Sequence, residues 1–122
     1  MFNISILIPT YNEEATIIPL LKSVKKETAK IKSVSFEIVV IDDCSRDNTN
    51  KLLRENETLY NYLLSLEINQ GKGGAVLRGL EKANGDYILF QDADLEYSPK
   101  DYKSLIRPIV DFDVDVVMGS RF

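Results

Sequence analysis

Two aspartates follow the fourth hydrophobic run of the chain, where "YILFQDAD" places Asp92 and Asp94 directly after an apolar stretch. In extended or turn geometry, carboxylates two residues apart can point to the same side, and like charges held together require a neutralising cation or proton. Mg²⁺ and Mn²⁺ take such oxygen ligands, commonly one or two carboxylates together with water and diphosphate oxygens. Taken alone, the triplet is explained at least as well by a solvated acidic turn, because short acidic motifs match by chance often.

Polar side chains also follow the first two hydrophobic runs. "ISILIPTYNEE" brings Thr10, Tyr11 and Glu13 after the first run, and "FEIVVIDDCSRDNT" brings Asp42 and Asp43 after the second. Each group by itself is compatible with an ordinary turn, since Asp, Asn and Thr hydrogen-bond readily to nearby backbone.

The segment "NQGKGGAV" combines three glycines with Lys72 ahead of a helical pattern. Such a loop could hold a phosphate on its backbone N–H groups. It matches neither G-x-G-x-x-G nor the P-loop pattern, and glycines that allow a helix to pack closely on a sheet are the alternative explanation.

The elements that must position these residues are predicted by five runs rich in Ile, Val, Leu and Phe, at residues 4–9, 36–42, 62–68, 87–92 and 115–120. Near-continuous apolar runs are typical of parallel strands that are covered on both faces. Their alternation with helical segments predicts a doubly wound α/β fold, a mostly parallel sheet with helices on both faces. Ligands of such sheets bind at the carboxyl ends of the strands.

The helix boundaries are predicted from their capping residues. Thr16 is the expected N-cap of a first helix that runs to about Lys30, and a second helix is expected to begin near residue 47 or 48. The third is expected to follow the glycines and to end at Asn84-Gly85 as a left-handed C-cap, and a fourth to start at Ser98-Pro99.

If strands one, two and four end at one edge, their polar residues form a single crevice. There Tyr11 or Pro9 would pack on a base, and Asp43 would accept a hydrogen bond from its N–H. Asp92 and Asp94 would hold metal-bound phosphates. Arg121, after the fifth run, would neutralise phosphate charge. The pattern therefore favours a site for a nucleoside diphosphate.

Composition limits the alternatives. The net charge of −4 argues against a nucleic-acid partner, and the single Cys44 makes a reducing, cytoplasmic location the simpler expectation. No apolar run approaches a membrane span, and the N-terminus lacks the basic flank of a signal peptide. The chain has no histidine, so metal or acid–base chemistry must use carboxylates.

Four segments resemble the family 2 inverting glycosyltransferases with a GT-A fold: "ISILIPTYNEE", "EIVVIDDCSRDNT", "NQGKGGAVLRGLEKANGDYILFQDADLEYSP" and "DVVMGSRF". The resemblance covers essentially the whole chain, and "GKGGAV", "QDADLEYSP" and "GSRF" are most similar to the polyprenyl-phosphate branch. It implies a Rossmann-like nucleotide-binding half and a single nucleotide-sugar-binding domain at residues 1–122. Relatives normally continue past "GSRF", so we expect this domain to be truncated at its C-terminus.

The resemblance implies a nucleotide pocket formed by Pro9, Thr10, Tyr11, Glu13, Asp42, Asp43, Lys72, Asp92 and Ala93. It implies metal ligands at Asp92, Asp94 and Glu96, the last standing where some relatives have Gln. The residues with catalytic roles would be Asp92, Asp94 and Arg121.

The implied reaction is metal-dependent transfer of a hexose, with inversion, from a UDP- or GDP-sugar to a polyprenyl phosphate such as dolichyl or undecaprenyl phosphate. Mg²⁺ or Mn²⁺ would be the cofactor, and the lipid acceptor implies a peripheral position at the cytoplasmic face of a membrane. A phosphate oxygen is already a nucleophile, so no dedicated base is needed. The implied partners include a C-terminal domain or a second copy of the chain in a homo-oligomer. We expect the isolated chain to bind a nucleoside diphosphate with metal but to transfer sugar poorly.

Two alternatives remain open from the residues. One is a receiver-like, Mg²⁺-binding signalling domain, although receivers carry their acidic pair after the first strand rather than the second. The other is a nucleotide-binding fragment without catalytic activity.

Overall fold

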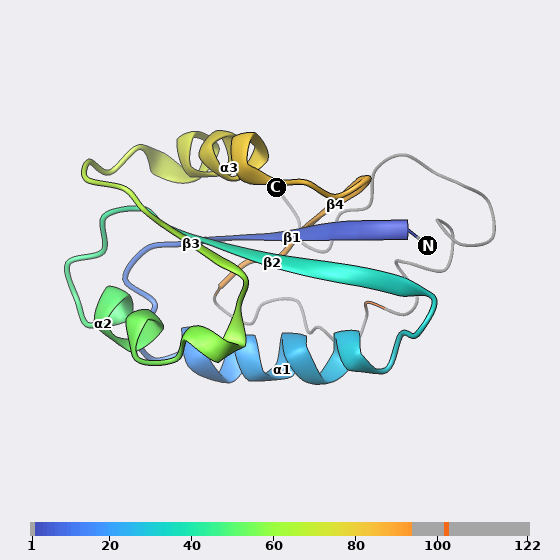
Figure 1. Cartoon of the computed structure of the whole chain (residues 1–122). Helices are drawn as coiled ribbons and strands as arrows, with labels where there is room; N and C mark the ends of the chain where they lie inside the picture. Colours follow the sequence, from blue (N-terminus) through green and yellow to red (C-terminus); the bar gives the residue numbers. More distant parts are fainter. Residues whose placement is uncertain (1, 94–101, 103–122) are drawn as a thin grey trace.

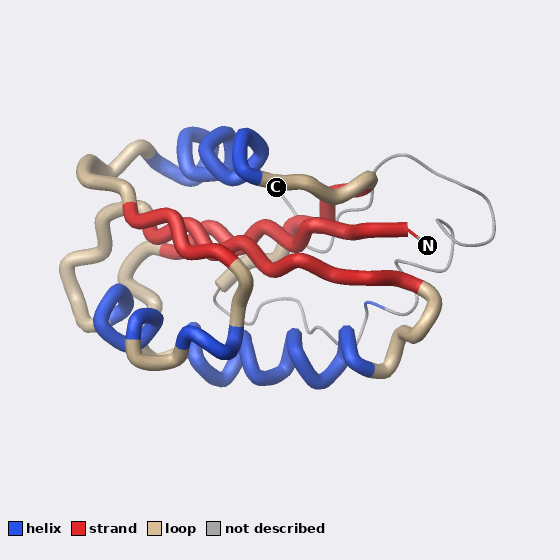
Figure 2. Tube along the Cα trace, in the orientation of Figure 1, coloured by secondary structure: helices blue, strands red, loops and turns tan. Residues whose placement is uncertain are grey.

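The structure is a computed structural model that describes residues 2–93 and Tyr102 (Figure 1). Its four strands are β1 (Phe2–Thr10), β2 (Val34–Asp42), β3 (Tyr62–Ser65) and β4 (Tyr87–Phe90). Its helices are α1 (Ile17–Ala29), α2 (Thr49–Arg54), the 3₁₀ helix η1 (Glu57–Leu59) and α3 (Gly71–Lys82). Figure 2 shows these elements along the chain trace.

The strands form one parallel sheet in the order β3-β2-β1-β4. Helices α1 and α2 cover one face of this sheet and α3 covers the other (Figure 1). The predicted doubly wound α/β fold is therefore confirmed. The order 3-2-1-4 is that of a dinucleotide-binding half, whereas receiver domains have the order 2-1-3-4-5, so the receiver alternative is wrong.

Strand β1 lies in the middle of the described sheet. It pairs with β2 from Phe2↔Val34 to Thr10↔Asp42 and with β4 through Ile4↔Tyr87 to Leu7↔Phe90. One face of β1 contributes Ile4, Ile6 and Ile8 to the larger core beneath α1, and the other contributes Leu7 to the core beneath α3. Coverage on both faces explains why the strand is apolar without alternation.

Most predicted boundaries are close to the observed ones. Thr16 immediately precedes α1, and Pro19 lies in its first turn, where a missing N–H costs nothing. Helix α2 ends at Arg54 and is followed by the separate turn η1, and β3 ends at Ser65, short of the expected strand. The fifth strand at 115–120 and the helix after Pro99 were predicted in segments outside the described residues.

The predicted left-handed C-cap at Asn84-Gly85 is wrong. Helix α3 ends at Lys82, and its cap residue Ala83 is extended at φ −64° and ψ 136°. Gly85 is needed for space instead, because a Cβ there would lie 2.6 Å from the backbone nitrogen of Ser5 and 3.0 Å from the carbonyl oxygen of Asn3. The turn into β4 therefore packs directly against the backbone of β1.

Glu37 of β2 holds the same turn in place. Its carboxylate accepts hydrogen bonds from the backbone N–H of Asn84 at 2.8 Å and from the hydroxyl of Ser5, and that hydroxyl accepts one from the N–H of Gly85. Burial raises the pKa of Glu37, but the hydrogen bonds from Asn84 and Ser5 outweigh this effect and hold the pKa below its usual value.

Replacing Gly85 with alanine tests the close approach of the turn to β1. The added methyl group meets backbone atoms that cannot rotate away, so Gly85→Ala should lower the free energy of unfolding by about 1–3 kcal/mol in chemical denaturation. Gly73→Ala is the matched control, because Gly73 is helical and has open space around it, and it should be neutral or stabilising by up to about 1 kcal/mol. Equal effects of the two substitutions would contradict this account of Gly85.

Candidate functional site

The loops after β1 and β2 are joined by Asn12. Its backbone is left-handed, with φ 52°, and its N–H donates to the hydroxyl of Ser45 at 2.9 Å. Its side-chain oxygen accepts from the backbone N–H of Arg46 at 2.8 Å and of Asp47 at 3.3 Å. Asparagine tolerates this backbone region better than most residues, so one side chain fixes two loops.

A second set of contacts joins the start of α1 to the start of α2. The N–H of Glu13 donates to the hydroxyl of Thr49 at 2.9 Å, and the carboxylate of Asp47 accepts from the N–H of the same threonine. The sequence did not predict that Asn12, Asp47 and Thr49 position these loops. It indicated only that Asn, Asp and Thr are common in turns.

Asp42 ends β2 and is only 2% exposed. One carboxylate oxygen accepts the N–H of Ser45 at 3.1 Å and the other accepts the side-chain amide of Asn50 at 2.8 Å. The same amide also donates to the hydroxyl of Ser65 at the end of β3. The carboxylate of Asp42 therefore orders the loop after β2 and connects it to α2 and β3.

Asp43 is also buried, but its carboxylate is arranged differently. Its N–H donates to the carbonyl of Thr10 at 2.8 Å, and its Oδ1 accepts the N–H of Gln70, just before α3, at 2.7 Å. Its carbonyl accepts the side-chain amide of Asn69. Among the described residues, no hydrogen-bond partner is found for its Oδ2, so one buried carboxylate oxygen remains available at the meeting point of β1, β2 and α3.

Asp92 follows β4 and forms a salt bridge with the ammonium group of Lys72. The aspartate side chain is 11% exposed and the lysine side chain 46% exposed. Lys72 is the second residue of α3, so this contact brings the end of β4 to the beginning of α3. The two residues, both predicted for the site, lie together and neutralise each other's charge.

The residues on either side of Asp92 are each held by a hydrogen bond from a distant residue. Gln91 accepts the phenol hydroxyl of Tyr102 at 2.8 Å, and burial raises the pKa of Tyr102 far above its usual value. The carbonyl of Ala93 accepts the hydroxyl of Thr16 at 2.8 Å. Tyr102 and Thr16 were not predicted to support the site, and only the folded chain brings them to it.

The end of β1 and the loop after it contain buried groups that already have partners and groups that a ligand could reach. Thr10 is buried, with its hydroxyl 3.1 Å from the carbonyl of Ile8, and Pro9 is half-buried. Glu13 is half-buried, with Oε2 3.0 Å from the hydroxyl of Thr16. Tyr11 is 41% exposed, which makes it the large apolar surface of this loop that a ligand could cover.

The glycines at the start of α3 do not pack against the sheet, so the packing explanation for them is wrong. A Cβ would have nothing within 4 Å at Gly71, whose φ is +78°, or at Gly73, and at Gly74 it would meet only the side chain of Gln70. Gly79 makes the close approach instead, since a Cβ there would lie 2.8 Å from Ile41. The first turn of α3 is thus open beside Lys72.

Three predicted residues, Asp94, Glu96 and Arg121, lie outside the described residues. Within residues 2–93 and Tyr102, no group of three or more His, Cys, Asp or Glu side chains is placed to hold a metal ion. The same part of the chain contains no helix with the length and apolar character needed to cross a bilayer.

The role of Asp42 can be tested through Asn50. Asn50→Asp would place a second carboxylate where an amide now lies 2.8 Å from Asp42, and at neutral pH this repulsion should lower the free energy of unfolding by about 1–3 kcal/mol. The deficit should shrink as the pH is lowered, because protonation of either carboxyl removes the repulsion. Asn48→Asp, with the same charge change on an exposed side chain, should stay within about 0.5 kcal/mol of the parent. A pH-independent deficit at position 50 would contradict this role.

The amino-acid sequence is similar to those of known glycosyltransferases. The chain is 36% identical to a dolichyl-phosphate beta-glucosyltransferase of Dictyostelium discoideum, over 97% of this chain and 39% of the relative. It is 32% identical to a dolichol-phosphate mannosyltransferase of Pyrococcus furiosus, over 98% of this chain and 33% of the relative. The chain therefore spans well under half the length of these relatives.

Solved structures resemble it over the same region. TarS from S. aureus in complex with UDP-GlcNAc matches with a TM-score of 0.73 and 32% identity, over 91% of this chain and 32% of that chain. The mannosyltransferase PcManGT from Pyrobaculum calidifontis, in complex with GDP-Man and Mn²⁺, matches with a TM-score of 0.75 and 26% identity, over 91% of this chain and 33% of that chain. The expected GT-A fold is confirmed. The model of glycosyl transferase family 2 matches residues 5–122, and the chain belongs to that family.

Proposed function

We propose that this chain is the nucleotide-sugar-binding domain, residues 1–122, of an inverting hexosyltransferase that uses a UDP- or GDP-sugar as donor. The observation that carries the proposal is the convergence of Asp43, Asp92 and Lys72 at the carboxyl ends of β2 and β4 and the beginning of α3. Parallel α/β sheets bind nucleotides at this position. The chain spans less than half the length of the two relatives named for dolichyl and dolichol phosphate, and binding of the nucleotide-sugar is the part of the reaction that its described residues carry.

Asp43 would recognise the base. Its Oδ2 has no partner among the described residues, and a buried carboxylate oxygen of this kind is stabilised by an N–H donor. Uracil and guanine both present a ring N–H, so either base fits the acceptor. The exposed ring of Tyr11, with Pro9 beside it, would cover the apolar face of the base, while Thr10 and Asp42 support the pocket through the backbone and the loop.

Lys72 and Asp92 would receive the diphosphate. In the chain alone the ammonium group of Lys72 neutralises Asp92, and the open first turn of α3 leaves room for phosphate oxygens beside them. A phosphate would attract Lys72 away from the carboxylate, and Asp92 would then need another cation. Ala93 follows Asp92 in the chain, and the Thr16 hydroxyl lies within hydrogen-bond distance of both the Ala93 carbonyl and the Glu13 carboxylate, so Ala93 and Glu13 would line the same pocket.

A divalent cation fits this donor set, because Asp92 offers a hard oxygen ligand whose negative charge needs a new partner once a phosphate has attracted Lys72. Asp94 and Glu96, outside the described residues, are proposed as the further ligands, and Arg121 as a phosphate contact. When bound, Mg²⁺ or Mn²⁺ offsets the charge that develops on the leaving diphosphate. The comparison with PcManGT, solved with GDP-Man and Mn²⁺, supports the choice of these cations.

The proposed acceptor is a polyprenyl phosphate. Both curated relatives described above are named for dolichyl or dolichol phosphate, and a phosphate oxygen attacks without prior deprotonation. A chain without histidine is consistent with a reaction that needs no dedicated base. A lipid-linked acceptor would bring the protein to the cytoplasmic face of a membrane as a peripheral enzyme. The net charge of −4 gives no reason to propose a nucleic-acid partner.

The base contact can be tested by calorimetric titration of the chain with UDP and with GDP. Asp43→Asn keeps an oxygen for the N–H of Gln70 but replaces the available acceptor oxygen with a donor, so affinity for the preferred nucleotide should fall about 10- to 100-fold. Asp86→Asn, an identical change at the amino end of β4, should leave the affinity unchanged. Equal affinity of the Asp43→Asn variant and its parent would refute the assignment.

Metal dependence can be tested in the same titrations with and without Mn²⁺. The cation should raise the affinity for the nucleoside diphosphate at least about tenfold, because it joins carboxylate to phosphate, and Asp92→Asn or Asp94→Asn should abolish that gain. Asp86→Asn again serves as the control. Binding that is equally tight without the cation would remove the metal from the proposal while leaving the base contact standing.

A further inference from the structure

Strand β3 is an edge of the described sheet, because β2 is its one neighbour there. About half of the backbone N–H and C=O groups of such a strand point away from the sheet. Natural proteins usually protect exposed edges with lysine, proline or charged side chains. The sequence of β3, "YLLS" at Tyr62–Ser65, contains none of these, so within residues 2–93 nothing protects this edge from pairing with another strand.

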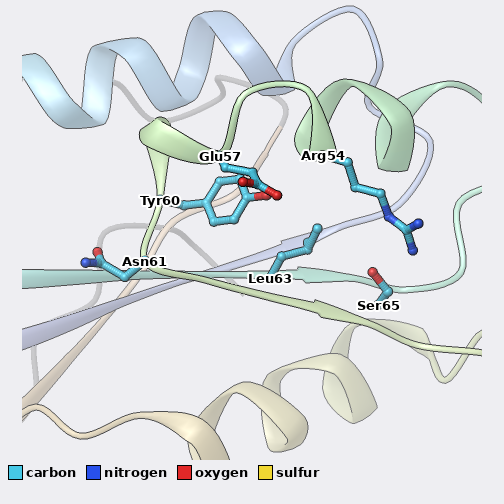
Figure 3. A pocket seen from close by; sticks show the side chains of 6 residues that line it. All are labelled: Arg54, Glu57, Tyr60, Asn61, Leu63 and Ser65. Carbon is cyan, nitrogen blue, oxygen red and sulfur yellow. The ribbon is translucent and has the colours of Figure 1, made fainter.

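Two hollows flank this edge, one on each face of the sheet. A cavity of about 600 Å³ on the side of α2 and η1 is lined by Arg54, Glu57, Tyr60, Asn61, Leu63 and Ser65 (Figure 3). A second cavity, of about 450 Å³, lies on the side of α3 and is lined in part by Leu64 and Leu66. Side chains of an added strand alternate between the two faces, so both hollows would receive them.

The charges in the larger hollow are arranged along the strand. Figure 3 shows the guanidinium group of Arg54 near Ser65, at the end of β3, and the carboxylate of Glu57 near Tyr60, before the strand begins. Both side chains are exposed, and within the described part of the chain neither forms a salt bridge. The Tyr60 ring beside Glu57 is fixed, since its hydroxyl donates to the carbonyl of Leu53 at 2.8 Å.

The charges of one copy are complementary to those of a second copy placed antiparallel to it. Two copies of β3 in antiparallel pairing place the end of one strand opposite the beginning of the other. Arg54 of each copy would then face Glu57 of the second copy, and a twofold axis produces this contact twice. A parallel neighbour would instead bring Arg54 to Arg54 and Glu57 to Glu57.

The other face of the strand needs no such pairing. Arg78 already forms a salt bridge with Glu81 at 2.9 Å, and Lys82 lies 4.4 Å from the centre of the Tyr62 ring. With these charges compensated within one copy, Leu64 and Leu66 are left as the groups that pack across the axis.

We propose that a second copy of this chain pairs antiparallel with β3, giving a twofold dimer with one continuous sheet and reciprocal Arg54–Glu57 contacts. The dimer would use the sheet edge opposite β4 and leave the carboxyl ends of β1 and β4 open. The inference stands apart from nucleotide binding, because neither Arg54 nor Glu57 belongs to the candidate site.

Sedimentation equilibrium of the protein and two charge-reversal variants provides the test. Arg54→Glu and Glu57→Arg each create two like-charge contacts in a homodimer, so each should raise the dimer dissociation constant at least about tenfold. An equimolar mixture of the two variants restores opposite charges at both contacts, and it should dimerise about as well as the parent. The double variant, with both charges exchanged, should also recover.

These exposed substitutions should leave the fold intact, which denaturation curves of each variant will verify. The proposal is overturned if the parent stays monomeric up to about 1 mM, where even weak association is detectable. It is equally overturned if the single variants dimerise as well as the parent, if their mixture fails to recover, or if open-ended oligomers form instead of a closed dimer.

Discussion

Hydrogen bonding of β1 to strands on both of its sides is the constraint on which the candidate site depends. Its parallel register with β2 brings Thr10 level with Asp42, and its pairing with β4 directs the chain after Phe90 to the same edge. Because β1 is buried on both faces, a shift in its register would move apolar side chains out of two cores at once. Three strand ends are therefore held in fixed relation before any loop contact is made.

Three aspartates at this edge are buried, and each is stabilised by a different kind of partner. Asp42 is satisfied by amide donors from Ser45 and Asn50, Asp43 by the backbone N–H of Gln70, and Asp92 by the ammonium group of Lys72. Buried carboxylates require such partners, since desolvation of an unpaired charge is costly. The partners also differ in how readily a ligand can replace them. A flexible lysine is displaced more easily than donors fixed within loops, so Asp42 supports the site while Asp92 can exchange its partner.

The sequence predicted the strands well because their apolar runs are local patterns that report burial on both faces. It predicted the helix starts less completely: Thr16 was correctly placed before α1, but its hydroxyl binds the carbonyl of Ala93 rather than its own helix. The predicted roles of the glycines were wrong at two places. Gly85 was assigned a left-handed backbone when its role is to make room for β1, and close packing on the sheet falls to Gly79 rather than to Gly71, Gly73 and Gly74. The missing information was the identity of the segment lying opposite each glycine.

The sequence by itself determined the class of fold, the strand ends at which polar residues occur, and the resemblance to a glycosyltransferase family, because hydrophobic periodicity and short motifs are properties of neighbouring residues. Only the tertiary structure decided which of Asp42 and Asp43 retains an available oxygen, and that Lys72 neutralises Asp92 across twenty positions of sequence. The reason is physical: a carboxylate's availability depends on donors that reach it through space, and those donors come from α2, from the start of α3 and from loops that the order of residues does not bring together.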